Sequence, residues 1–406
     1  MLISLSWRNI WRQPVRSILS LLGMSLTSML LVFMLSFQLG SYDMMKTGSL
    51  SLFDGFGQFQ PVGYPEDPDI SRRIENADSI LTAVQALPEI TNITTRASGF
   101  VILANGDRSF GAAVVGIDPS TEGAISTLSS TIKQGRYLEP DDDGAIVIGD
   151  GLARNLKLQV GDSVVLLGSG SDGSVAADVL TLVGVFHSGV PELDRQIAQM
   201  PLPRFQETFA LSGDVNTIAF KGDDLADVVR IDAELRQIAN DNGVLYRSWD
   251  ELQPAIKQMI QLDMSTSGMM YITLVTVVVF IILNTLYMSV LERTREFGGL
   301  LALGMRPRQI GKMVWLELIF LSFLGCGIGV ILGSALTLYF LNVGIYIPGM
   351  EEIYAQWGIP SRMYPAFTVF SALAGPAAIV VSICLLGFIP YRRILGLEPV
   401  TAMAAS

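Results

Sequence analysis

The chain has 406 residues, of which half are hydrophobic and only 16% are charged. This composition is too apolar for an ordinary water-soluble protein and indicates a membrane protein. The formal net charge of −11 argues against nucleic acid as a partner, because a nucleic-acid-binding surface needs an excess of basic residues.

Four windows are apolar enough, and long enough at about 20 residues, to cross a bilayer as helices. They are Ile18–Leu39, Met270–Leu291, Val314–Leu341 and Phe367–Ile389. We expect the first to be retained, because it is longer than the apolar region of a signal peptide and no small-residue cleavage site follows it. The sequence therefore predicts an α-helical membrane protein with four transmembrane helices and a large α+β periplasmic domain between helices 1 and 2.

Basic residues beside the spans predict the orientation, because Lys and Arg concentrate on the cytoplasmic side. They precede span one, separate spans two and three, and follow span four, at Arg8, Arg12, Arg16, Arg293, Arg295, Arg306, Arg308, Lys312, Arg392 and Arg393. Both termini are thus expected in the cytoplasm. Residues 41–268 carry 32 acidic and 16 basic side chains, which argues against anionic lipid headgroups as the partner of this external part.

The expected domain map follows from these spans and their flanks. It consists of a cytoplasmic N-terminal segment (1–17), helix 1 (18–40), the periplasmic domain (41–268), helix 2 (269–291), a charged cytoplasmic segment (292–312), helix 3 (313–341), a short periplasmic loop (342–365), helix 4 (366–389) and a cytoplasmic tail (390–406).

Helical and strand patterns alternate within the periplasmic domain. Apolar residues at helical spacing predict helices at Asp78–Leu87 and Asp223–Asn240. The pair Asn105-Gly106 predicts a tight hairpin between two strands. From about 112 to 209 the chain reads as short strands with turns. We interpret the domain as an α+β part with a β-rich part inserted into it.

Two short motifs in the periplasmic domain imitate binding loops. "GSGSDG" (168–173) matches G-x-G-x-x-G, but a strand pattern follows it where a dinucleotide site needs a helix, so we expect a hairpin tip. "EPDDDG" (139–144) lacks the remaining ligands of a calcium loop, so we expect a solvated turn.

The residues suited to metal binding or catalysis are few and scattered. His187 is the sole histidine, and no second metal ligand or nucleophile pattern accompanies it in the sequence. Cys326 and Cys384 fall inside spans three and four and are interpreted as small core residues. No G-x-x-x-x-G-K-[ST] motif is present. We therefore expect no metal site, no cofactor and no catalytic residue in this chain.

The segment "LERTREFGGLLALGMRPRQI" (291–310) is unusual for a turn between two spans. Gly298 and Gly299 weaken a helix and permit a bend, and Pro307 suits the first turn of the next helix. Leucines exposed between charges are typical of a docking surface. The alternative is a simple loop whose positive charges keep it in the cytoplasm. The residues alone leave both interpretations open.

This segment resembles the signature of the FtsX-like permease family, in which an Arg-Glu pair precedes glycine, leucines, Ala-x-Gly and a basic-Gln-Ile end. "PYRRILGLEPVTAM" (390–403) is similar to the same family's C-terminal ending. "WRNIWRQPVRSILSLLGMSL" looks like the start of the lipoprotein-releasing (LolC/LolE-like) branch. "LQVGDSVVLL" and "VGVFHSGVPELD" look like that branch and its MacB-type relatives. The resemblance covers nearly the whole chain.

The resemblance implies the permease subunit of an ABC transporter. Such a subunit pairs with a second permease, identical or homologous, and binds two copies of a separate cytoplasmic ABC ATPase that holds ATP and Mg²⁺. The ATPase would grip residues 292–312 as a coupling segment. The family's coupling role is carried over onto Glu292, Arg293, Glu296, Gly298, Leu300, Leu303, Gly304, Arg306 and Ile310. The family often has a basic residue where Leu301 stands, so one salt bridge to the ATPase is expected to be missing.

The family also implies mechanotransmission, in which ATP hydrolysis drives work on the periplasmic side without cargo crossing the membrane. We expect lipoprotein extraction from the inner membrane, because of the N-terminal resemblance and because no ATPase is fused to this chain. The alternatives are MacB-like export of periplasmic peptides or small molecules through an adaptor, and FtsX-like regulation of a cell-wall hydrolase. The polar tip "GSGSDG" has no apolar side chain with which to hook a periplasmic chaperone, as that branch does.

Two further groups of residues have expected roles in packing and cargo binding. Gly325, Gly329 and Gly333 recur every four residues and predict close helix packing, within one subunit or at a dimer seam. Methionines gather at the outer ends of spans one and two, and their thioethers suit variable apolar ligands. The candidate cargo surface comprises Phe37, Leu39, Tyr42, Met44, Met45, Met259, Met264, Met269 and Met270. The alternative is ordinary packing between the two helices.

Overall fold

The computed structural model describes residues 2–12, 14–75, 77–349, 354 and 362–395. The chain divides into two compact units. The membrane unit comprises Met1–Tyr42, Ile260–Tyr346 and Arg362–Ser406, and the large domain comprises Asp43–Met259 and Ile347–Ser361.

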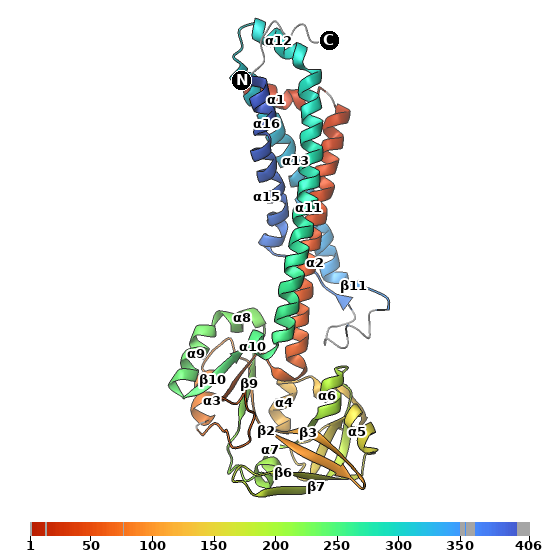
Figure 1. Cartoon of the computed structure of the whole chain (residues 1–406), viewed down its shortest axis with the longest axis vertical. Coiled ribbons are helices and arrows are strands. Elements are labelled where there is room, and N and C mark those ends of the chain that lie inside the picture. The colour runs from red at the N-terminus through yellow and green to blue at the C-terminus, as the bar shows by residue number, and fades with distance from the viewer. Residues whose placement is uncertain (1, 13, 76, 350–353, 355–361, 396–406) are drawn as a thin grey trace. The chain divides into compact units, whose positions relative to one another are not determined.

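Within the part of the chain that the structure describes, four helices are long and apolar enough to cross a membrane. They are α2 (Pro14–Ser49), α11 (Pro254–Glu292), α13 (Pro307–Val343) and α15 (Val369–Leu386). Each coincides with one of the four predicted spans, and they run alongside one another in the membrane unit (Figure 1). α2 and α11, at 36 and 39 residues, are longer than the roughly 20 residues that a span requires. Both include residues that belong to the large domain.

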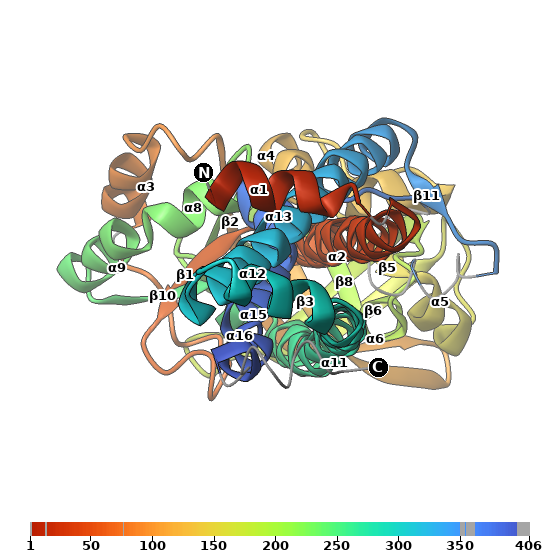
Figure 2. The same cartoon turned by 90° about the horizontal axis from the view of Figure 1, so that it is seen from above.

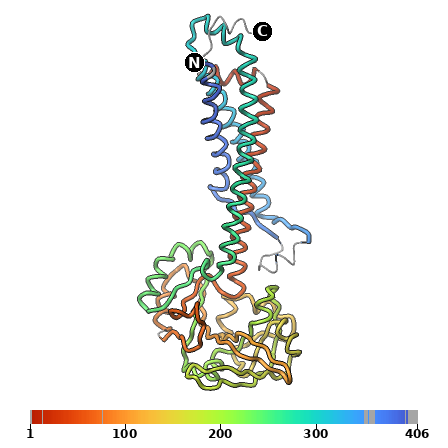
Figure 3. Tube along the Cα trace, in the orientation of Figure 1, coloured from red at the N-terminus to blue at the C-terminus, as the bar shows by residue number. Residues whose placement is uncertain are grey.

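Shorter elements complete the membrane unit. They are α1 (Leu2–Ile10), α12 (Thr294–Ala302), α16 (Phe388–Leu395) and the strand pair β11 (Ile345–Tyr346) and β12 (Arg362–Met363). In the view along the long helices, α1 lies crosswise to α2 (Figure 2). α1 and α12 lie at the same end of the membrane unit (Figure 3).

The three regularly spaced glycines of α13 pack against α2 of the same chain. A Cβ atom on Gly329 would lie 2.4 Å from the Cβ of Ser28, and one on Gly333 would lie 2.8 Å from the Cβ of Val32. The hydroxyl of Ser28 donates a hydrogen bond to the carbonyl of Cys326 at 3.1 Å. Gly325 likewise faces α2. Packing within one subunit, the first of the two expectations, is therefore what these glycines serve.

The expected bend at Gly298 and Gly299 is wrong, because α12 continues through both residues. The chain departs from helical structure at Arg293 instead, and again after α12, where Gly304 adopts a φ of +94°. That left-handed conformation favours glycine. Pro307 begins α13 as its first residue, which confirms the expected helix start.

The described residues of the large domain form one ten-stranded mixed sheet. Its strands are β1 (Gly57–Pro61), β2 (Asn92–Asn105), β3 (Arg108–Ile117), β4 (Ile132–Gly135), β5 (Ala145–Gly149), β6 (Ser163–Ser169), β7 (Val175–Phe186), β8 (Ile197–Pro201), β9 (Thr217–Lys221) and β10 (Val244–Ser248). The strand order is β10-β1-β9-β2-β3-β8-β5-β7-β4, and β6 pairs with both β2 and β7.

That last pairing closes part of the sheet into a ring. β2, β3, β8, β5, β7 and β6 each pair with the next, and β6 returns to β2, whereas β10, β1 and β9 form an open arm that ends on β2. The ring is the β-rich part that the sequence predicted. Its boundary lies earlier than the expected residue 112, which falls inside β3, because the fourteen-residue β2 is long enough to serve both parts of the sheet.

Short helices cover this sheet. They are η1 (Leu50–Asp54), α3 (Ala77–Gln85), α4 (Pro119–Ile125), η2 (Leu128–Thr131), α5 (Asp150–Leu156), α6 (Pro191–Gln196), α7 (Leu202–Thr208), α8 (Leu225–Arg230), α9 (Asp232–Asp241) and α10 (Trp249–Leu252). The helix expected at 78–87 is confirmed as α3. The single helix expected at 223–240 is two, because the chain leaves helical structure at the buried Ile231.

The predicted β2–β3 hairpin is present, but its turn is shifted by one residue. Asn105 pairs with Arg108 as the last rung of the ladder, so the turn residues are Gly106 and Asp107. Gly106 has a φ of +60°, and the hairpin places glycine where a left-handed conformation is needed.

One ion pair lies in the interior of the large domain. Arg96 of β2 and Glu122 of α4 are 2% and 0% exposed, and their two hydrogen bonds measure 2.9 and 2.7 Å. The guanidinium of Arg96 also lies over the ring of Phe53 in η1, 4.4 Å from its centroid. This contact ties η1, the turn that directly follows α2, to the sheet.

Candidate coupling site

The turn between α12 and α13 is the exposed tip of the coupling segment (292–312). Leu303 is 85% exposed, and Gly304 and Arg306 beside it are exposed too. The backbone N–H of Arg306 donates to the side chain of Gln309 at 3.0 Å, which fixes the start of α13. The local structure thus presents one leucine and one arginine on a short, defined turn.

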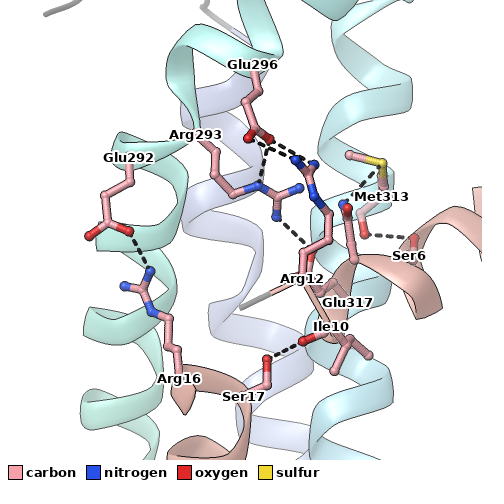
Figure 4. Close-up of polar contacts among 11 residues, drawn as sticks. Ser6, Ile10, Arg12, Arg16, Ser17, Glu292, Arg293, Glu296, Met313 and Glu317 are labelled. Carbon is pink, nitrogen blue, oxygen red and sulfur yellow. Dashed lines mark hydrogen bonds and ion pairs between the residues drawn. The ribbon is translucent and has the colours of Figure 1, made fainter. Parts of the chain in front are cut away.

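Behind this tip, two acidic residues of the segment pair with the N-terminal residues of the chain (Figure 4). Arg12 donates two hydrogen bonds to Glu296, at 3.1 and 3.2 Å. Arg16 binds Glu292 at 2.9 Å and also donates to the backbone carbonyl of Thr285 in α11. The bidentate geometry of the first pair adds directional preference to charge attraction. These contacts tie the start of α2 to the end of α11 and to α12.

A third arginine joins the segment to α13. Arg293 lies 3.3 Å from Glu317 and 3.5 Å from Glu296. The side chains of Arg293 and Glu317 are only 11% and 12% exposed. A carboxylate within an apolar helix is costly unless it is paired, so Arg293 is the partner that Glu317 requires.

The short helix α1 is anchored on the same side. The hydroxyl of Ser6 donates to the carbonyl of Met313 at 3.1 Å, and Ile10 is buried. Ser17 donates to the carbonyl of Ile10 at 2.6 Å, which holds the corner between α1 and α2. The N-terminal residues, the coupling segment and α13 are therefore connected through specific polar contacts.

A pocket of about 190 Å³ lies beside these contacts. It is lined by Asn9, Arg12, Arg16, Ser17, Ser20, Met24, Ile282, Thr285, Leu286, Ser289, Arg293, Glu296, Glu317, Leu318 and Leu321. Three arginines and two glutamates line it, so the pocket carries only a small excess of positive charge. The exposed ion pairs beside the pocket can break and re-form with other charged groups. Such pairs suit a contact that transmits movement between helices.

The nine residues predicted for ATPase coupling fall into three groups. Leu303, Gly304 and Arg306 are exposed at the tip. Glu292, Arg293 and Glu296 are paired within the chain. Gly298 and Ile310 are buried and Leu300 packs against the core of the membrane unit. The tip residues are available to a partner, whereas the buried residues support the segment from within; the ATPase contact itself stays a prediction.

Sequence reasoning missed Arg12, Arg16 and Glu317 as members of this site. The sequence indicated only an orientation role for Arg12 and Arg16, because Arg12 lies in the turn after α1 and Arg16 in α2, and no local pattern links them to the coupling segment. Glu317 is the single acidic residue of α13, and an acidic residue in an apolar helix signals a paired or functional site. That signal was present, but the partner lies 24 residues away in sequence.

The candidate cargo residues differ sharply in exposure. On α11, Met259, Met264, Met269 and Met270 are exposed. On α2, Tyr42 and Met45 are buried, while Phe37, Leu39 and Met44 are partly buried. The thioethers of α11 are thus accessible, and those two residues of α2 serve packing. A cargo role stays a prediction for the exposed methionines.

Tyr42 belongs to a polar cluster that joins α2 to α11 within the membrane unit. Its hydroxyl donates to Asp263 at 2.5 Å, and the amide of Gln38 donates to the same carboxylate oxygen at 3.0 Å. The hydroxyl of Tyr271 donates to the side-chain carbonyl of Gln38 at 2.7 Å. Together with Arg16, this cluster connects α2 and α11 at two separate levels.

The tip "GSGSDG" is the predicted β6–β7 hairpin turn, and it is polar. The strands beside it are different. The outward face of β2, β6 and β7 carries aligned apolar side chains, because Ile102 pairs with Leu167, and Val165 pairs with Val179. All four are exposed. An apolar surface therefore exists beside the hairpin tip, where the sequence indicated none.

"EPDDDG" is a turn, as predicted. Asp142 accepts two hydrogen bonds from Arg136, at 2.6 and 2.7 Å, and one from the backbone N–H of Glu139. The Arg136 hydrogen bonds hold the pKa of Asp142 below its ordinary value. The positive charge beside Asp142 in this turn is thus supplied by the Arg136 side chain.

These features define a class: a polytopic membrane protein with a large domain between its first two spans and a charged segment between the next two. Two family models match the chain. One describes the MacB-like periplasmic core domain and matches residues 17–238; the other describes the FtsX-like permease C-terminal region and matches residues 268–399. The chain belongs to the MacB/FtsX-like family of ABC transporter permeases.

Individual relatives are more distant. The chain is 25% identical to the lipoprotein-releasing system transmembrane protein LolC of Neisseria meningitidis over 75% of this chain and 72% of that protein. It is 24% identical to LolE of Haemophilus influenzae, over 69% and 68%. It is also 25% identical to the pyoverdine export ATP-binding/permease protein PvdT of Pseudomonas fluorescens, over 99% of this chain and 59% of that protein. Family members work with ABC ATPases, and permease subunits of this family are generally not catalytic.

Proposed function

We propose that this chain is the membrane subunit of an inner-membrane ABC transporter that extracts lipoproteins. A separate cytoplasmic ATPase, in two copies, would bind ATP and Mg²⁺ and press on the tip at Leu303 to Arg306. A second permease, identical or homologous, would complete the membrane part. Both termini and the coupling segment would lie in the cytoplasm, and the large domain in the periplasm.

The observation that carries the proposal is the set of ion pairs behind the tip. Arg12 and Arg16 hold α12 and the end of α11 to the start of α2. α2 and α11 are the two helices that include residues of the large domain. Force applied to the tip would therefore reach both helices at once, and through them the large domain. This is mechanotransmission, and it needs no path for cargo through the membrane.

Lipoprotein release is favoured because the alignments with LolC and LolE cover two thirds or more of both partners. A second candidate, export through a periplasmic adaptor, is favoured by the alignment with PvdT, which covers 99% of this chain. The two functions differ in cargo: the first requires an acylated protein, and the second a soluble periplasmic molecule.

The deciding experiment is native mass spectrometry of the complex purified from its own membrane without added nucleotide. We expect two ATPase copies, two permeases and a bound acylated polypeptide. Leu303→Asp should remove the ATPase copies, because it places a charge on the exposed apolar tip. Val229→Asp, on an exposed valine of the large domain, is the matched control and should retain them. A complex with a periplasmic adaptor and no acylated polypeptide would establish export instead.

The cargo surface is tested on α11 alone. Met264→Asp with Met269→Asp alters two exposed side chains, and should abolish co-purification of the acylated polypeptide while the ATPase copies remain. Met45 is excluded from this test, because it is buried and a charge there would disturb packing. If the double variant co-purifies with as much acylated polypeptide as the parent does, the methionines do not bind cargo.

The apolar face of β2, β6 and β7 is the proposed contact for a periplasmic chaperone or adaptor. Val179→Glu would place a charge in the middle of that face and should reduce transfer of released cargo to the chaperone at least tenfold. Val229→Glu is again the control, because it introduces the same charge at an exposed valine that lies outside this face. Equal transfer by the two variants would exclude this face.

A further inference from the structure

The fold brings two carboxylates to the sole histidine of the chain. His187 directly follows β7, Asp150 begins α5 and Asp194 lies in α6. The Nδ1 atom of His187 lies 3.0 Å from Oδ2 of Asp150 and 3.0 Å from Oδ2 of Asp194. One atom from each of the three groups falls within 4.8 Å of the others. The sequence did not indicate this site, because His187 lies 37 positions after Asp150.

Both carboxylates are held in place within the domain. Asp150 is 8% exposed and Asp194 is 4% exposed. Oδ1 of Asp194 accepts hydrogen bonds from the backbone N–H and the hydroxyl of Ser188, at 2.7 and 2.8 Å, which leaves Oδ2 directed to His187. Secondary contacts of this kind orient the carboxylate ligands of metal ions.

A separate observation points to a missing ligand. Oδ1 of Asp150 is buried and has no hydrogen-bond partner among the described residues, and a buried carboxylate oxygen without a partner is costly. A single Nδ1–H proton of His187 also cannot bond fully to two carboxylates. The hydrogen-bonding capacity of the three groups is therefore not satisfied by one another.

Two basic residues also contact Asp150. Arg154 lies 2.8 Å and Lys133 lies 3.6 Å from its Oδ2 atom. Both side chains are more than half exposed, so either can turn into solvent at small cost. They leave Oδ1 of Asp150 unused, and the structure gives neither an ion pair with Asp194.

We propose that Asp150, His187 and Asp194 bind a divalent transition-metal ion of the zinc type. An imidazole nitrogen with two carboxylate oxygens is a donor set that zinc accepts, and three protein ligands leave one position open. Tetrahedral ligands about 2.0–2.1 Å from zinc lie about 3.3–3.4 Å apart. The two separations between Nδ1 of His187 and the carboxylate oxygens, 3.0 Å each, are a few tenths of an ångström shorter than this, and the ligand atoms of all three groups lie within 4.8 Å of one another.

The site has a route to solvent and a structural consequence. The side chain of His187 is 41% exposed, so an ion can reach Nδ1 without opening the domain. Once bound, it would connect the end of β7 to α5 and α6. Zinc would then stabilise the β-ring part of the large domain, independently of any cargo or ATPase.

The test is zinc binding by the full-length chain in detergent, free of affinity tags and stripped with a chelator. Equilibrium dialysis with metal analysis should give one Zn²⁺ per chain. His187→Gln and Asp194→Asn should each weaken binding at least tenfold. Asp142→Asn is the matched control, because Asp142 is a partly buried carboxylate paired with arginine at another turn, and it should bind as the parent does.

A second measurement does not depend on variants. Diethyl pyrocarbonate modifies imidazoles, and the chain has a single histidine, so mass spectrometry reports His187 alone. Zinc should slow this modification at least fivefold in the parent chain. Equal zinc binding by all four chains, no stoichiometric uptake by the parent, or unchanged modification of His187 in saturating zinc would each overturn the proposal.

Discussion

Two ion pairs, one in the large domain and one in the membrane unit, differ sharply in their exposure to solvent. In the large domain, Arg96 and Glu122 are almost completely removed from solvent. In the membrane unit, Arg12 and Glu296 form a comparable bidentate pair with both side chains about half exposed. A buried pair cannot open without leaving a charge in a medium of low polarisability, whereas an exposed pair exchanges readily with water or with a partner's charges. The Arg96–Glu122 pair therefore suits a domain that moves as a rigid body, and the Arg12–Glu296 pair suits a contact that opens and re-forms when helices move.

The largest expected effect is on the buried pair. Arg96→Met should destabilise the large domain by about 3–5 kcal/mol, because Glu122 is left buried and unpaired. Thermal unfolding of the purified chain, followed by circular dichroism, measures this loss. The double variant Arg96→Met with Glu122→Met should recover most of it. If Arg96→Met unfolds at the same temperature as the parent, the buried pair is not required for stability, and the proposed difference between the two ion pairs is wrong.

Close packing of α13 against α2 should contribute to the rigidity of the membrane unit. Gly329→Val should cost about 1–3 kcal/mol by overpacking, because its Cβ would lie 2.4 Å from the Cβ of Ser28. Gly327→Val is a close control in the same helix, since a Cβ there meets nothing within 4 Å. Thermal unfolding in detergent should separate the two variants, and equal stability would show that α13 does not depend on α2 at this point.

A third prediction concerns pH and the large domain. Asp178 is 8% exposed, and burial alone would raise its pKa. Hydrogen bonds from Arg204, Val179 and Thr208 outweigh burial, so the pKa of Asp178 lies below its ordinary value. A lowered folded-state pKa adds stability at neutral pH, and this stability is lost as the pH falls through that pKa.

Asp178→Asn should therefore cost about 1–3 kcal/mol at pH 7 and progressively less below pH 4. Thermal unfolding of parent and variant across this range gives the difference. Asp227→Asn, in an exposed pair with Arg230, is the control and should show a smaller, flatter effect. A constant difference between parent and Asp178→Asn at all pH values would contradict the assignment.

The smallest effect on stability is expected at the exposed pair. Arg12→Glu should change the unfolding free energy by only about 0.2–1 kcal/mol, yet reduce cargo release by the reconstituted transporter severalfold. The charge swap Arg12→Glu with Glu296→Arg should restore release, because the pair is re-formed in reverse. Failure of the swap, with normal ATPase binding, would mean that Glu296 acts on the partner and not on Arg12.

The four spans and the coupling segment could be predicted because their signals are local. Long apolar windows specify helices, and Pro307 marks the start of α13 by its own backbone geometry. The bend was misplaced for a related reason: glycine lowers helix propensity by only about 1 kcal/mol. Packing of Phe297 and Gly298 in the core outweighs that amount.

The residues of the coupling site could be predicted only where one continuous segment of the sequence contains them. The tip residues Leu303 and Arg306 follow from the coupling motif, but the partners of Glu292 and Glu296 come from the N-terminus, more than 270 residues earlier. The group at His187 was missed in the same way. Contacts between residues so far apart in sequence depend on the tertiary packing of helices and strands, and a local sequence pattern does not specify that packing.

The pairing of β1 with β10 bears on how the protein is made. Gly57 lies opposite Ser248, so β1 cannot pair with β10 until roughly 190 further residues have been synthesised. Contacts between residues so far apart in sequence form slowly. With the large domain in the periplasm, as proposed, β10 would cross the membrane only just before α11 enters the bilayer. We therefore expect the domain to be translocated unfolded, with periplasmic chaperones shielding its apolar strands until the second span is inserted.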